Sequence, residues 1–214
     1  MKRLALIILF LFTAGTLLGA PLKLVNVSAP KINCKFSTNC QTTGQDMTSD
    51  IGAPEIKAKG FLQSRALTVG QPGTAAAGLY GYLYRIDLTN LVAPGLKAKT
   101  CVATLSIEFG PVKSLDYDGD GSLDQVFVIT SGGLGTVAPV SATQTGNVIT
   151  FTFPSHPCTG TMSGKGESSF FVGLVSAQTS KTVAARLKTT ADAVLSLNAY
   201  APVPPPPVQP SWKK

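Results

Sequence analysis

Apolar and polar residues alternate along much of this chain, between short turns rich in Gly, Pro, Ser and Thr. In CVATLSIEF, residues 101–109, the odd positions are apolar, and NVITFTF (147–153) and TVAARLK (182–188) repeat the pattern. A period of two residues is typical of a strand with one buried face. We therefore expect an all-β fold.

Other segments add strands to this expectation. QVFVIT (125–130) and SSFFVGLV (168–175) are apolar at consecutive positions, which predicts central strands covered on both faces. Weaker candidates are FLQSRALTV (61–69), LYGYLYRIDL (79–88) and AVLSLNA (193–199). About eight or nine strands and no convincing amphipathic helix predict an antiparallel β-sandwich of two packed sheets.

The amino terminus, MKRLALIILFLFTAGTLLGA, combines two basic residues, an apolar run and small residues near its end. This pattern predicts a secretory signal over residues 1–20, with cleavage after Ala20. The alternative is an uncleaved membrane anchor, because about 20 apolar residues span a bilayer. Loss of Lys2 and Arg3 with the leader would lower the formal net charge of +7 by two. We expect a secreted or cell-surface protein.

The rest of the chain divides into three parts. Residues 21–60 show little strand pattern and are predicted to be an irregular amino-terminal segment, whereas residues 61–200 carry the sandwich. Residues 201–214, APVPPPPVQPSWKK, contain six prolines and are predicted to be an extended tail outside the fold. A spacer is favoured over a docking peptide, because prolines alone do not specify a partner.

Four cysteines, at positions 34, 40, 101 and 158, favour disulfides in an exported protein. Three pairings are possible. We favour Cys34 with Cys40, because NCKFSTNC can close a small loop, which leaves Cys101 to join Cys158. Zinc is disfavoured, because His156 is the only histidine in the chain.

Four aspartates are crowded into DYDGDGSLD, in a chain with few other acids. Carboxylates at loop positions 1, 3, 5 and 9, with glycine at position 6, match the spacing of calcium-binding loops. Calcium is favoured over a solvated acidic turn, because so many adjacent carboxylates repel one another without a cation. The predicted ligands are Asp116, Asp118, Asp120, Asp124 and the backbone carbonyl of Ser122.

An EF-hand is excluded, because its glutamate at position 12 is replaced here by Phe127. Instead, residues 116–130 resemble the DxDxDGxxD loops of integrin α-subunit and FG-GAP repeats, which join two β-strands. The resemblance implies a calcium site and nothing about adhesion. The chain as a whole also resembles small exported β-proteins of bacteria, a likeness that implies no activity.

Other candidate sites are weaker. His156 lies between prolines beside a predicted disulfide, where a loop histidine is favoured over a catalytic base. Tyr80, Tyr82 and Tyr84 share one strand face and could form an aromatic platform for sugars. A core role is favoured, because Ile86 continues the same face.

These features favour a non-enzymatic structural or cell-surface role for an exported protein stabilised by calcium and disulfides. The alternatives are a carbohydrate- or matrix-binding module and, ranked last, a secreted hydrolase. Candidate partners are an extracellular polymer, a glycan or further copies of the chain. Nucleic acid is excluded as a partner because the lysines are scattered without interleaved aromatics, and a membrane is not expected after signal cleavage.

Overall fold

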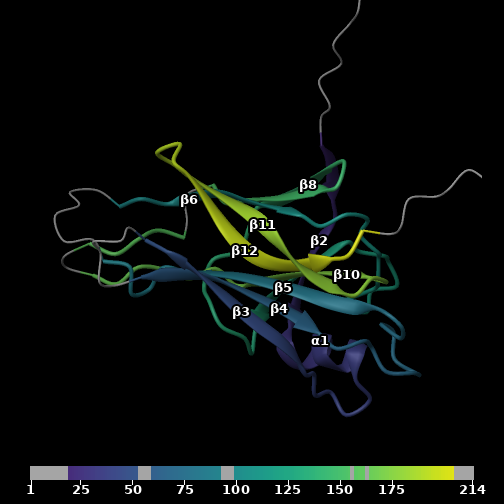
Figure 1. Cartoon of the computed structure of the whole chain (residues 1–214). Helices are drawn as coiled ribbons and strands as arrows, with labels where there is room; N and C mark the ends of the chain where they lie inside the picture. Colours follow the sequence, from purple (N-terminus) through teal and green to yellow (C-terminus); the bar gives the residue numbers. More distant parts are fainter. Residues whose placement is uncertain (1–18, 53–58, 93–98, 155–156, 162–163, 205–214) are drawn as a thin grey trace, which may run out of the picture.

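The computed structural model describes residues 19–52, 59–92, 99–154, 157–161 and 164–204. Two six-stranded sheets pack face to face, which confirms the predicted all-β sandwich (Figure 1). In order across the sheet, sheet A consists of β1 (Ala20–Leu22), β8 (Ser141–Thr145), β9 (Val148–Thr152), β6 (Val102–Glu108), β11 (Ser180–Thr189) and β12 (Val194–Pro202). Sheet B consists of β2 (Leu24–Ser28), β7 (Val126–Ser131), β10 (Phe171–Ser176), β5 (Tyr80–Asp87), β4 (Gly60–Leu67) and β3 (Gly44–Ile51).

Among the strands that the structure describes, every pairing is antiparallel except that of β2 with β7, which is parallel. The chain passes from the edge of sheet A to the edge of sheet B at Lys23, between β1 and β2. Across the molecule, the other two edges approach each other. The Asn198 N–H of β12 donates to Ser49 Oγ of β3 at 3.1 Å, and Tyr200 N–H donates to Ser64 Oγ at 2.8 Å. Both open sides of the sandwich are therefore bridged.

The main core lies between the sheets and follows the predicted alternation. Ile149, Phe151 and Phe153 point inward from β9 and its end, as do Ala185 and Leu187 from β11. Each is almost fully buried, and burial of one such aliphatic or aromatic side chain stabilises a fold by about 1.5–3 kcal/mol. The alternation therefore identified the inward faces correctly.

A second apolar cluster covers the outer face of sheet B beneath α1 (Ala29–Phe36). Strands β7 and β10 contribute to both clusters, so they are buried on both faces as predicted. Phe127 lies across β10 at Gly173, where a Cβ atom would come 2.1 Å from the ring. Only glycine leaves room for this ring, which forms the floor under the aspartate loop.

Residues 21–60 were predicted to be irregular, but the structure shows regular elements there. They are α1, most of β1, and the strands β2 and β3. The helix begins after Ser28, whose side chain accepts a hydrogen bond from Lys31 N–H, and it has proline in its first turn. Both are helix start signals. In β3, Met47, Ser49 and Ile51 alternate with exposed positions, but only two of these three residues are apolar. The sequence of β3 therefore lacks the apolar alternation that identifies half-buried strands.

The tail also begins later than predicted. Ala201 and Pro202 belong to β12 and pair with β11, and Ala201 is fully buried. Proline is tolerated there because it ends a strand at the edge of the sheet. Residues 205–214 lie outside the described residues.

Both disulfides favoured by the cysteine spacing are present, Cys34–Cys40 and Cys101–Cys158. The first links α1 to the turn after it. The second joins the segment entering β6 to Cys158, which lies 57 residues away in sequence.

Candidate metal centre

The aspartate loop is held at both ends. Leu115 and Asp124 exchange two backbone hydrogen bonds, of 3.0 and 2.9 Å. Between them, the Tyr117 ring packs on Phe127 with 4.8 Å between ring centroids. The loop thus covers part of the second apolar cluster on sheet B, to which Tyr117 and Phe127 belong.

The loop backbone curls around its own carboxylates. The Asp116 side chain accepts hydrogen bonds from Gly119 N–H at 2.6 Å and Gly121 N–H at 3.1 Å. Both glycines have positive φ, of 83° and 87°, a conformation that a residue with a Cβ rarely adopts. These two glycines therefore allow the tight turns that aim successive aspartates at one region.

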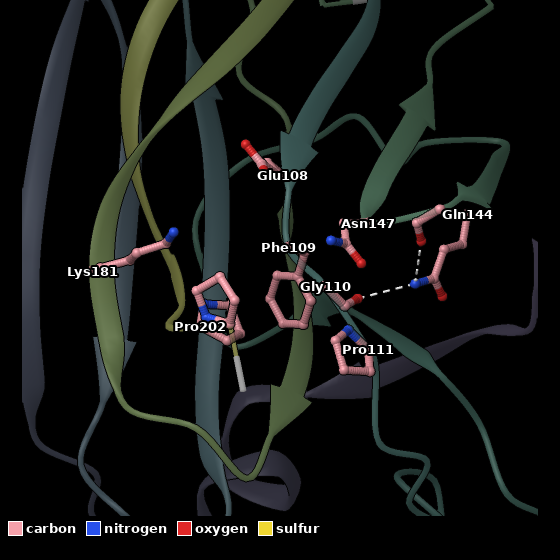
Figure 2. A pocket seen from close by; sticks show the side chains of 10 residues that line it. Glu108, Phe109, Gly110, Pro111, Gln144, Asn147, Lys181 and Pro202 are labelled. Atoms are coloured by element: carbon pink, nitrogen blue, oxygen red, sulfur yellow. Dashed lines mark hydrogen bonds between the residues drawn. The ribbon is translucent and has the colours of Figure 1, made fainter. Parts of the chain in front are cut away.

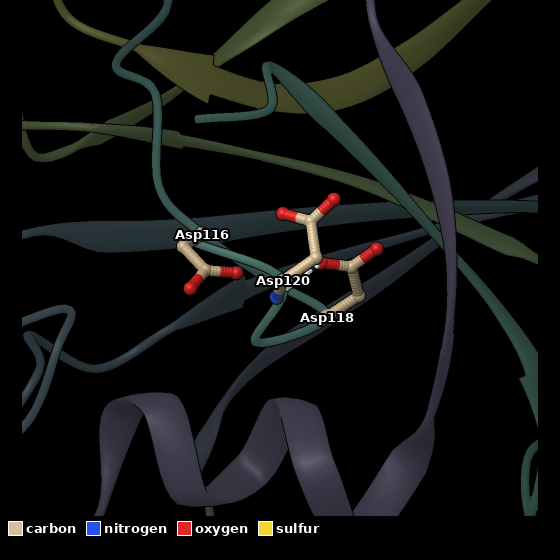
Figure 3. A group of neighbouring side chains, drawn as sticks. All are labelled: Asp116, Asp118 and Asp120. Carbon is tan, nitrogen blue, oxygen red and sulfur yellow. Dashed lines mark hydrogen bonds between the residues drawn. The ribbon is translucent and has the colours of Figure 1, made fainter. Parts of the chain in front are cut away.

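Three carboxylates converge as a result. Asp116, Asp118 and Asp120 each offer an oxygen, and these oxygens lie within 4.8 Å of one another (Figure 3). Within the described ranges, this is the one group of three or more His, Cys, Asp or Glu side chains that could hold a metal ion. The Asp118 and Asp120 side chains also accept backbone hydrogen bonds, from Asp120 N–H at 3.1 Å and Ser122 N–H at 2.7 Å.

Helix α1 lies beside the loop and contributes positive charge. Lys31 Nζ donates to the backbone oxygen of Asp118 at 2.8 Å. Partial desolvation raises the pKa of the Asp116 carboxyl, but the N–H donors of Gly119 and Gly121 and the charge of Lys35 outweigh it and hold this pKa below its usual value. Asp116 is therefore ionised and available to a cation across the neutral range.

The structure does not bring Asp124 into this group. Its side chain is fully buried, and Oδ1 lies 2.7 Å from Lys23 Nζ, its only partner among the described residues. Tyr117 N–H approaches Oδ2 at 3.4 Å. The pairing of Lys23 with Asp124 raises the pKa of the Lys23 ammonium group, mainly through their side-chain hydrogen bond. Asp124 is thus placed to anchor the crossing between β1 and β2.

Sequence reasoning missed the lysines around the loop. Along the sequence, Lys23, Lys31 and Lys35 look like scattered surface lysines, yet in the fold each lies close to one of the aspartates or to its backbone. No local pattern links position 23 to position 124. The helix start at Ser28 was the available signal that residues 31 and 35 share one helical face.

Two of the three tyrosines that share a face of β5, Tyr82 and Tyr84, belong to the core, which is the role that the sequence favoured. Tyr82 and Tyr84 are buried between the sheets, and their hydroxyl groups donate to the backbone oxygens of Gln178 and Tyr200, both at 2.7 Å. Desolvation raises the pKa of both phenols. These two rings offer no aromatic platform, and only Tyr80 is partly exposed. His156 lies outside the described residues.

In the part of the chain that the structure describes, no helix is both long and apolar enough to cross a membrane. Comparison with known protein families, with characterised proteins and with solved structures gives no significant match. The likeness to integrin α-subunit loops therefore stays confined to the aspartate spacing.

Proposed function

We propose that this chain is an exported, non-enzymatic structural protein of the cell surface or extracellular space, stabilised by a bound calcium ion and by two disulfides. The observation that carries the proposal is the convergence of Asp116, Asp118 and Asp120 in a loop with preformed turns. Two cross-links in a chain of 214 residues also suit an oxidising compartment.

Calcium is the metal that suits these ligands best. It takes six to eight oxygen ligands in flexible geometry, whereas magnesium demands a near-ideal octahedron and retains more water. The three carboxylates and the carbonyl of Ser122 would supply the protein ligands, with water completing the shell. Because Asp124 is held by Lys23, the proposed ligand set is smaller than the spacing predicted.

The ion would act on stability through Tyr117. This residue lies between the first two aspartates and is buried in the second apolar cluster. Calcium would neutralise the repulsion between the carboxylates and fix the loop on which Tyr117 is carried. A free loop would leave Phe127 and its neighbours less well covered.

Thermal unfolding in calcium and in EDTA tests the proposal. At a free calcium concentration 100 times Kd, binding stabilises the folded state by about 2.7 kcal/mol. For a domain of this size, that corresponds to a rise in Tm of roughly 5–10 °C. We expect Asp118→Asn/Asp120→Asn to lose this rise. The matched control Asp192→Asn, which removes a carboxylate that is 84% exposed and far from the loop in sequence, should retain it.

An identical Tm in calcium and EDTA would contradict the calcium site, and an equal response to magnesium would contradict the choice of metal. A carbohydrate-binding function has no comparable support, because Tyr82 and Tyr84, the rings that suggested it, are buried.

A further inference from the structure

An apolar cavity opens at one end of the sandwich, between the two sheets. Its volume is about 250 Å³. The lining side chains come from both sheets and from the segments that follow β5 and precede β6, and they include Ile51, Leu88, Leu91, Val102, Leu187 and Leu195. An apolar cavity of about 150 Å³ is enough to bind benzene in a protein interior. This cavity is therefore large enough for an aromatic side chain.

The charges near the cavity do not select an ionic ligand. Lys59 pairs with Asp50 at 2.6 Å, and Lys188 pairs with Asp192 at 2.7 Å, so two of the nearby lysines are already neutralised. An occupant of this cavity is thus recognised mainly by its apolar surface.

The carboxyl-terminal tail leaves the fold at the opposite end. Leu195 lines the cavity at the start of β12, whereas Val203 is still tied to Thr179 by a backbone hydrogen bond of 2.7 Å. Figure 1 shows the β11–β12 turn and the end of β12 at opposite ends of the sandwich. At about 3.3 Å per residue, Pro204 lies roughly 30 Å along the strand direction from Leu195.

A different cleft, of about 400 Å³, lies where the tail begins, and Pro202 and Pro204 help to line it (Figure 2). On one side of the cleft, Gln144 Nε2 donates a hydrogen bond to Gly110 O at 3.0 Å. Phe109, the only aromatic side chain in this lining, is 1% exposed. The cleft thus lacks the accessible aromatic surface that proline-rich segments use for docking.

The tail carries Trp212, the only tryptophan in the chain, followed by two lysines. From Pro204, the last residue that the structure describes, the eight residues to Trp212 span at most about 29 Å when fully extended. The roughly 30 Å back to Leu195 would therefore take the whole tail in a straight line along its own chain. A second copy can bring its cavity to the tail without this constraint.

We propose that Trp212 of one molecule fills the apolar cavity at the Leu195 end of a second copy. Tryptophan is enriched among residues that dominate binding energy in interfaces. Because the tail and the cavity lie at opposite ends, the contact is head to tail and leaves one tail and one cavity free at the ends of each assembly. The proposal is independent of the calcium site.

The single tryptophan makes the test direct, since all indole fluorescence reports on position 212. The full chain without its predicted leader is examined over a concentration series by fluorescence and sedimentation velocity. We expect the emission maximum to move to shorter wavelength as the sedimentation coefficient rises. Leu195→Glu places a charge in the cavity and should abolish both changes. Val194→Glu, its matched control on the same strand at a residue 61% exposed, should retain them.

Mixing two variants gives the decisive result. Leu195→Glu has a tail but a blocked cavity, and Trp212→Ala has a cavity but no tryptophan, so neither should associate alone. Their mixture should form a one-to-one dimer with shifted emission. Thr100→Lys, also in the cavity lining, replaces Leu195→Glu if that variant fails to fold.

An emission maximum typical of exposed indole at every concentration would overturn the proposal. A shifted maximum in a monomer would also overturn it, because the tail would then reach a site on its own chain. Failure of the mixed variants to form a dimer would overturn it as well, because a free tail and a free cavity would then be present without associating.

Discussion

Replacing Lys23 with methionine removes the charge that compensates the buried Asp124 carboxylate. Asp124 Oδ1 lies 2.7 Å from Lys23 Nζ, and the Asp124 side chain is fully buried whereas that of Lys23 is 47% exposed. Breaking a fully buried pair by removing one partner costs about 3–5 kcal/mol, because the remaining charge is left uncompensated. Water that reaches the site beside the exposed lysine lowers this cost. We therefore expect the loss from Lys23→Met to lie between that of an exposed pair and that of a fully buried one.

Urea unfolding followed by circular dichroism, with EDTA present, measures this loss without any metal contribution. Lys59→Met is the matched control, because it breaks a pair in which both side chains are more than half exposed and should cost at most about 1 kcal/mol. Lys23→Met/Asp124→Asn should recover much of the loss, since the unpaired charge is then gone. Equal effects of Lys23→Met and Lys59→Met would refute the burial argument.

The same pair sets a pH dependence at the alkaline end. The pKa of Lys23 is raised above its ordinary value of 10.5 in the folded state, chiefly by Asp124. A raised pKa means that the stabilisation is fully present below the unfolded value and is lost as pH rises through the folded value. The difference in unfolding free energy between the parent chain and Lys23→Met should therefore shrink above about pH 10.5, as urea titrations across this range would show. A constant difference would contradict the assignment.

Three further changes have defined outcomes in urea unfolding. Tyr117→Phe should be neutral or stabilising by up to about 1 kcal/mol, because the buried hydroxyl has no hydrogen-bond partner among the described residues; a clear loss would reveal a partner. Gly173→Ala should cost more than about 3 kcal/mol or prevent folding, since the new methyl would overlap the Phe127 ring, and a cost below about 1 kcal/mol would show that the ring can move. Replacing both Cys101 and Cys158 with serine should cost about 4 kcal/mol for a separation of 57 residues, and an unchanged stability would contradict the loop-closure account.

The sandwich was predictable because the order of apolar and polar residues in its inner strands matches which of their faces are buried. Ile149, Phe151 and Phe153 alternate with threonines since one face of β9 meets the core. The polar edge strand β3 was missed, because its more buried face carries only Met47 and Ile51 as apolar residues. The parallel pairing of β2 with β7 depends on contacts that no local pattern encodes.

In the candidate site, too, the part set by local sequence was predictable and the part set by distant contacts was not. Local spacing predicted that Asp116, Asp118 and Asp120 would meet, since two glycines in the same loop set the turn. The same spacing assigned Asp124 to the ion, whereas the fold pairs it with Lys23. That partner is distant in sequence, and only the completed sheet brings it into reach.

The crossing at Lys23 sets an order for the folding of this chain. Lys23 N–H bonds to the side chain of Gln125, 102 positions later, and β2 has no neighbour in sheet B until β7 exists. Contacts between such distant residues form slowly, because a long loop must close first. β2 is thus made about 100 residues before its neighbour β7 and is among the last of the described strands to be paired.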